Sequence, residues 1–220
     1  MTVYARARAP DRPRRVAAWL LPGVLVSGLA LVVTARLVAT RAGLDAIAVG
    51  AAFGMALAAL ALWPFGRQLA RPARSFDRHR RRPSRQLAVA AGAGVAFGLA
   101  LIGLAILGPA LAGSATAPGI GRPAAPFVPW VAVTILVATA EEVLLRGILL
   151  DRIQRAGGLV PAVILTSVVF ALMHVPLYGW HVVPLDFAVG LGLAGLRLTT
   201  RSLVAPAAAH AVADLATWWL

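Results

Sequence analysis

A chain of 220 residues that is 60% hydrophobic and 13% charged lies outside the range of soluble domains, which are about 45–50% apolar and about 25% charged. The formal net charge of +13 does not indicate nucleic-acid binding, because the arginines lie between long apolar runs, where they suit contact with anionic lipid. Cysteine is absent, which excludes disulfides and thiolate metal sites.

Three long apolar runs predict three transmembrane helices in the first half of the chain. A basic tail, residues 1–15, precedes the run Val16–Ala35, which is too long for the apolar core of a signal peptide. The second run is Ala46–Gly66 and the third is Leu87–Leu111, with an arginine-rich loop at residues 67–85 between them. Each run can cross about 30 Å of hydrocarbon as a helix, a form that satisfies its own backbone groups.

Four less uniform runs follow a loop rich in Gly and Pro at residues 112–126. They are Phe127–Leu150, Leu159–Tyr178, Val182–Leu196 and Ser202–Leu220, and unlike the first three they contain ionisable residues. In the third of them the single charge is Asp186, which we interpret as an interfacial residue. The sequence therefore predicts an all-α transmembrane bundle of about seven spans. Three helices within residues 16–111 precede a core at residues 127–220.

The placement of arginine predicts the orientation of the chain. If the N-terminus is cytoplasmic, most basic positions fall on the cytoplasmic side, namely those of the tail, the 67–85 loop and Arg152, Arg155, Arg197 and Arg201. The positions on the outer side are Arg36, Arg41 and Arg122. This bias follows the positive-inside rule. We therefore expect a multi-pass protein of the cell membrane with a cytoplasmic N-terminus.

The segment ATAEEVLLRGILL places three ionisable residues inside one span. Each such residue costs about 2.5–3.5 kcal/mol at the bilayer centre, so their presence indicates a function. Glu142 and Arg146 are four residues apart, in the order that favours an ion pair on one helix face. Glu141 projects about 100° away and lacks such a partner. We interpret Glu141 as a candidate general base and Glu142 with Arg146 as an orienting pair. A purely structural clamp is the alternative.

Two further segments place histidine inside an apolar run. Phe170 and His174 are four apart on one helix face in VVFALMHVP, and we expect an orienting role for Phe170. His210 and Asp214 are four apart in HAVAD. Taken alone, either histidine could be a packing residue. Counted from the predicted cytoplasmic ends at about 1.5 Å per residue, both histidines reach the same mid-membrane level as Glu141. A shared polar site is therefore expected.

These three segments resemble the motifs of the CPBP family, which comprises CAAX proteases and bacteriocin-processing enzymes. EEVLLR is similar to its EExxxR motif and FALMH to its FxxxH motif. FAVGLGLAGLRLTTRSLVAPAAAHAVAD is similar to its final block, which ends in HxxxN or a variant. The order and spacing of the three segments agree with the family pattern over about Phe127 to Leu220.

The resemblance implies an intramembrane endopeptidase related to the prenyl-protein CAAX protease. It implies that Glu141 and His174 activate the attacking water and that His210 and Asp214 stabilise the oxyanion. Asp214 departs from the family pattern, which more often has Asn, and an ionised Asp would repel an oxyanion unless it is protonated. The implied partners are membrane lipid and a peptide or protein substrate, and no nucleic acid.

Alternatives remain at this point. Glu141, His174, His210 and Asp214 could bind a divalent metal such as zinc, although the HExxH signature is absent and no cofactor is our first expectation. A non-catalytic membrane adaptor or immunity protein could keep the fold without turnover. A small transporter could use Glu141 and His174 as proton carriers.

Overall fold

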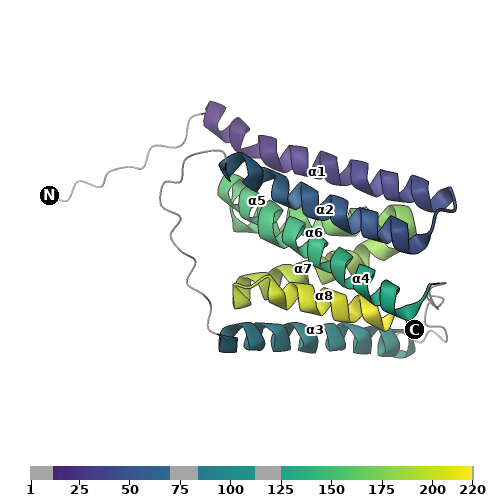
Figure 1. Ribbon diagram of the computed structural model, residues 1–220. Coiled ribbons are helices and arrows are strands. Elements are labelled where there is room, and N and C mark those ends of the chain that lie inside the picture. The colour runs from purple at the N-terminus through teal and green to yellow at the C-terminus, as the bar shows by residue number, and fades with distance from the viewer. Residues whose placement is uncertain (1–11, 70–83, 112–124, 220) are drawn as a thin grey trace.

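The computed structural model describes residues 12–69, 84–111 and 125–219, and every regular element in these ranges is a helix (Figure 1). The first helices are α1 (Arg12–Arg41), α2 (Ala46–Leu69) and α3 (Ser84–Leu111). The C-terminal part contains α4 (Phe127–Glu142), the π-helical segment η1 (Val143–Leu149), α5 (Leu150–Gly157), α6 (Leu159–Tyr178), the short 3₁₀ helix η2 (Trp180–Val182), α7 (Val183–Thr200) and α8 (Val204–Ala216). The predicted all-α fold is confirmed for these residues. The tail before residue 12, most of the 67–85 loop and residues 112–124 lie outside them.

Six helical stretches in the described residues are long and apolar enough to cross a membrane. They are Ala17–Arg41, Ala46–Pro64, Ser84–Leu107, Phe127–Gly157, Leu159–Tyr178 and Trp180–Thr200. The predicted seventh span differs, because its helix, α8, has only 13 residues. At 1.5 Å per residue it is about 20 Å long, which is less than the thickness of the hydrocarbon core. The chain turns at Arg201 with a φ of 52°, so α8 begins late, and it ends in a turn after Ala216.

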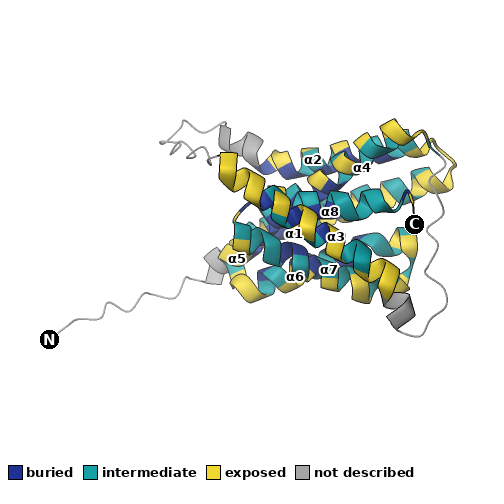
Figure 2. Ribbon diagram, turned by 90° about the horizontal axis from the view of Figure 1, so that it is seen from below, coloured by how far each residue is buried: buried dark blue, intermediate teal, exposed yellow. Residues whose placement is uncertain are grey.

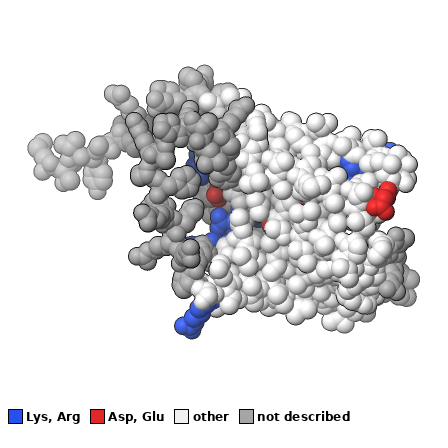
Figure 3. Space-filling model, in the orientation of Figure 1, with Lys and Arg blue, Asp and Glu red and all other residues white. Residues whose placement is uncertain are grey.

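Successive membrane-spanning stretches run in alternating directions, with α4, η1 and α5 forming one continuous stretch, and this gives the bundle two distinct ends (Figure 1). We call the end where α1, α3, α6 and α8 begin the N-terminal end. The end where α2, α4 and α7 begin, and where the chain finishes, is the C-terminal end. Charged atoms gather at these two ends, and the wall between them is almost free of charge (Figure 3). This distribution is what a membrane-spanning bundle requires.

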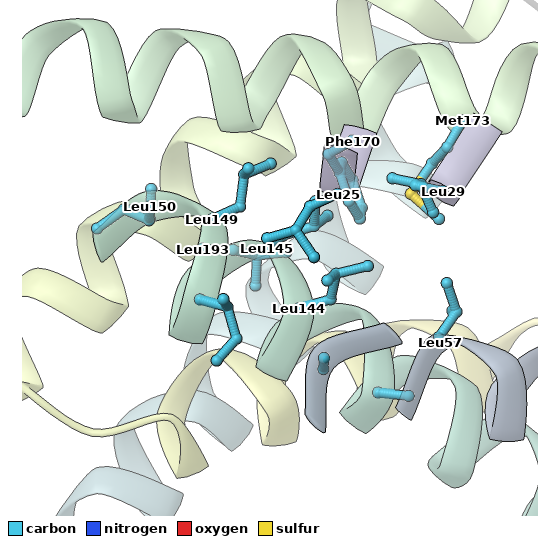
Figure 4. Packing of buried hydrophobic residues seen from close by; sticks show 14 of the residues in the cluster. Leu25, Leu29, Leu57, Leu144, Leu145, Leu149, Leu150, Phe170, Met173 and Leu193 are labelled. Carbon is cyan, nitrogen blue, oxygen red and sulfur yellow. The ribbon is translucent and has the colours of Figure 1, made fainter. Parts of the chain in front are cut away.

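Apolar side chains both fill the interior and cover the outside of the bundle. The interior cluster joins Leu25 of α1, Leu57 of α2, Phe170 of α6 and Leu193 of α7 to the leucines that follow the two glutamates (Figure 4). On the outside, Val128 is 74% exposed, and exposed residues line the outward faces of the helices (Figure 2). So much exposed apolar surface would be unusual for a soluble monomer, and it fits a lipid-facing surface.

Small residues hold α8 close to α3. Gly94 and Gly98 lie one turn apart on α3 and face α8. A Cβ atom at Gly98 would lie 2.7 Å from the carbonyl oxygen of Ala209, and a Cβ atom at Gly94 would collide with the backbone of Ala205. Such glycine spacing lets membrane helices approach closely. The α3–α8 contact therefore fixes the position of the helix that carries His210.

Candidate active site

A buried ion pair lies at the centre of the site. Arg146 Nη1 donates to Glu142 Oε1 at 2.8 Å, and both side chains have no exposed surface. Arg146 Nη2 donates to the carbonyl oxygen of Gly190 on α7 at 3.2 Å. The guanidinium carbon of Arg146 lies 4.6 Å from the centre of the Phe170 ring. The expected Glu142–Arg146 pair is present, and it also ties the α4–η1 helix to α6 and α7.

The ion pair coincides with a change of helix type. Glu142 is the last residue of α4, and Arg146 lies in the middle of the π-helical segment η1. Arg197 Nε of α7 donates to the carbonyl oxygen of Arg146 at 3.3 Å, and Arg197 Nη2 lies 3.9 Å from Asp151 Oδ1. Segments of π-helix are rare and occur frequently at functional sites. Contacts in both directions between Arg146 and α7 therefore hold this segment in place.

His210 joins the two glutamates to the final motif. Its Nδ1 lies 3.1 Å from Glu142 Oε1, so Nδ1 carries a proton and donates to that carboxylate. Its Nε2 lies 3.7 Å from Glu141 Oε2 and 3.4 Å from Asp214 Oδ2. Glu142 therefore orients the ring so that Nε2 faces both of the other carboxylates. The four-residue spacing of His210 and Asp214 allows their contact, whereas nothing in the sequence indicated the contact with Glu142, which spans 68 positions.

His174 is held by its own helix and by α7. Its Nδ1 lies 2.8 Å from the carbonyl oxygen of Phe170, so Nδ1–H donates there and Nε2 is the free nitrogen of the neutral ring. The same Nδ1 lies 3.6 Å from Asp186 Oδ2. The interfacial interpretation of Asp186 missed this contact. The only signal in the sequence was a single charge in an otherwise apolar run.

The Phe170 ring separates the two histidines. The ring centres of Phe170 and His174 are 4.8 Å apart, and those of Phe170 and His210 are 5.4 Å apart, both with edge-to-face geometry. Phe170 is 3% exposed. It therefore spaces the FALMH and HAVAD motifs by packing, which is consistent with its predicted orienting role.

Glu141 lies where the three motifs meet. It is 3% exposed, and its electrostatic neighbours include His210, His174 and Asp214. The structure therefore brings together all four residues that the sequence proposed as catalytic, although it does not test their roles. It offers an oriented carboxylate–imidazole cluster that can accept and donate protons.

No group of three or more His, Asp or Glu side chains within residues 12–69, 84–111 and 125–219 is close enough to hold a metal ion. The four residues are near neighbours without forming a ready-made coordination shell. The metal-dependent alternative stays a prediction for metal analysis.

Comparison with known families agrees with the motifs. Residues 123–216 match the family model described as "Type II CAAX prenyl endopeptidase Rce1-like". The matched range includes the EEVLLR, FALMH and HAVAD segments, and α1 to α3 precede it. The match supports a CPBP family intramembrane protease and confirms the resemblance that the motifs indicated. The curated proteins and the solved structures provide no significant match to the chain.

Proposed function

On the basis of this CPBP family match, we propose that the chain hydrolyses a peptide bond inside the membrane with water activated by Glu141 and His174. The Rce1-like match supports a CAAX-type intramembrane endopeptidase in general. The observation that carries the finer proposal is the convergence of Glu141, His174 and His210 on one buried cluster. The proposed substrate is a peptide or protein in the cell membrane, and the arginine bias supports a cytoplasmic N-terminus.

The first step is proton removal from water. The Glu141 carboxylate accepts a proton while the water oxygen attacks the carbonyl carbon of the scissile bond. The free Nε2 of His174 accepts a hydrogen bond from the same water and orients it. In the second step the proton passes from this pair to the leaving amine as the C–N bond breaks, which gives a carboxylic acid and an amine.

The negative charge on the carbonyl oxygen needs a donor at the same time. His210 is the proposed donor through Nε2–H, because Glu142 holds the other ring nitrogen and favours a doubly protonated, positively charged ring. Asp214, 3.4 Å from His210 Nε2, would share this role only in its protonated form. In its ionised form Asp214 instead stabilises the His210 cation.

The test is cleavage of a peptide library by the purified protein. We expect Glu141→Gln and His174→Gln to lower kcat by about 10²–10⁴-fold each, the range of general acid–base catalysis. His181→Gln is the matched control, because His181 is exposed on η2 and outside the site. Full activity in Glu141→Gln would refute the proposal and would favour the non-catalytic alternative.

A further inference from the structure

Exposure of the ionisable side chains changes along the bundle axis. Glu142 and Arg146 have no exposed side-chain surface, and Glu141 and His210 have 3% and 5%. The residues on the other side of Glu141 are more open, since His174 is 18% exposed and its partner Asp186 is 21% exposed. On this side of Glu141 the polar side chains of the cluster are therefore themselves partly exposed.

That direction is towards the C-terminal end of the bundle. His174 lies in the last turns of α6, Asp186 in the first turn of α7 and Asp214 near the end of α8. The side chain of Asp214 is 43% exposed. Tyr178, the last residue of α6, stacks on the His174 ring at 5.9 Å and is 52% exposed. These residues extend the polar cluster as far as the end of the helices.

The exposed surface of Asp214 indicates water. A charged side chain that faced acyl chains would cost several kcal/mol, and such residues face the bundle interior or a water-filled cavity. Just after the end of α8, Trp218 packs on Trp130 of α4 with ring centres 4.8 Å apart. Trp130 and Trp218 therefore close the contact between α8 and α4 at this end.

The opposite direction is blocked. Thr166 and Ser167 of α6 are fully buried, and their hydroxyls donate to the carbonyl oxygens of Ala162 and Val163 in the same helix. The interior cluster also contains fully buried leucines, namely Leu144, Leu145, Leu149 and Leu150, which follow Glu141 along its helix, and Leu193 of α7. At the N-terminal end Arg197 and Asp151 are partly exposed, but this pair meets the buried Arg146 at its backbone carbonyl oxygen and not at its side chain.

From this asymmetry we propose that water and substrate reach Glu141 only from the C-terminal end of the bundle, between the ends of α6 and α8. The proposal rests on the proposed function and adds the class of substrate. The enzyme takes a peptide segment presented at the membrane surface on the side of the α1–α2 loop. With a cytoplasmic N-terminus, this is the outer side of the membrane.

The natural absence of cysteine allows a direct test. Single cysteines are introduced in the full chain as Asp214→Cys and Tyr178→Cys. Two reference variants mark the ends of the bundle, Ala42→Cys in the α1–α2 connection and Arg155→Cys on α5. Membrane vesicles of either orientation are then treated with a membrane-impermeant maleimide. We expect Asp214→Cys and Tyr178→Cys to react in the vesicles in which Ala42→Cys reacts, and not in those in which Arg155→Cys reacts.

A matched control separates water from lipid exposure. Leu172 on α6 is exposed but lies in an apolar stretch. We expect Leu172→Cys to remain unlabelled in both vesicle types. Labelling of Asp214→Cys and Tyr178→Cys together with Arg155→Cys, or in neither preparation, would overturn the proposal. So would equal labelling of Leu172→Cys. Because labelling does not depend on turnover, this result is independent of the cleavage assay.

Discussion

The buried Glu142–Arg146 pair provides the strongest test of how the site is stabilised. Arg146→Met removes the guanidinium and leaves the Glu142 carboxylate buried without a cation other than His210. Breaking a buried pair from one side costs about 3–5 kcal/mol, because a charge is left without compensation. Both side chains have no exposed surface, so solvent does not reduce this cost. Glu142→Gln is expected to cost a similar amount, since it leaves the Arg146 charge unpaired.

The double variant should cost less than the sum of the two single variants. It leaves neither charge, and Gln at position 142 retains an acceptor for His210 Nδ1. In the parent protein Glu142 Oε2 and Arg146 Nε have no hydrogen-bond partner among the described residues, so the pair is not fully satisfied. We therefore expect a favourable coupling of about 0.5–3 kcal/mol, the range for residues in one network.

The assay is reversible unfolding of the four proteins in mixed micelles, with the free energy of unfolding measured for each. Arg155→Met is the control, because Arg155 is exposed on α5, and exposed substitutions stay within about 0.5 kcal/mol. The reasoning fails if the two single effects simply add. It also fails if Arg146→Met is as stable as the control.

Three other outcomes are expected. Gly94→Leu should lower the melting temperature and separate α3 from α8, because a Cβ atom at position 94 meets the α8 backbone. Gly92→Ala on the same helix is the control and should be neutral, because a Cβ atom at position 92 meets no atom within 4 Å. Phe170→Ala should destabilise the protein by about 3–5 kcal/mol through the cavity it leaves, as measured by unfolding. It should also lower kcat in the cleavage assay, because His174 and His210 lose the ring that lies between them. Treatment with a chelator, followed by metal analysis, should leave cleavage intact under the metal-free mechanism, and loss of activity that zinc restores would favour the metal-dependent alternative.

Local features of the sequence predicted most of the fold. Hydropathy and length identify a membrane helix from its own residues alone, so the runs that became α1 to α7 could be recognised without tertiary information. The run Ser202–Leu220 was less predictable, because the turn at Arg201 and the end of the helix after Ala216 shorten α8 to less than a full span. The sequence motifs likewise indicated the family whose model matches residues 123–216.

The contacts of the candidate site likewise include some that the sequence predicted and some that it did not. The Glu142–Arg146 pair was predictable because residues four apart share a helix face. The donation from His210 Nδ1 to Glu142 and the approach of Asp186 to His174 were not, because each joins residues on different helices. Such contacts depend on how closely α8 approaches α3 and α4 and how α7 lies against α6, and no spacing along the chain encodes those distances. The sequence determined which ionisable groups enter the membrane, and only helix packing decided which nitrogen of each histidine meets which carboxylate.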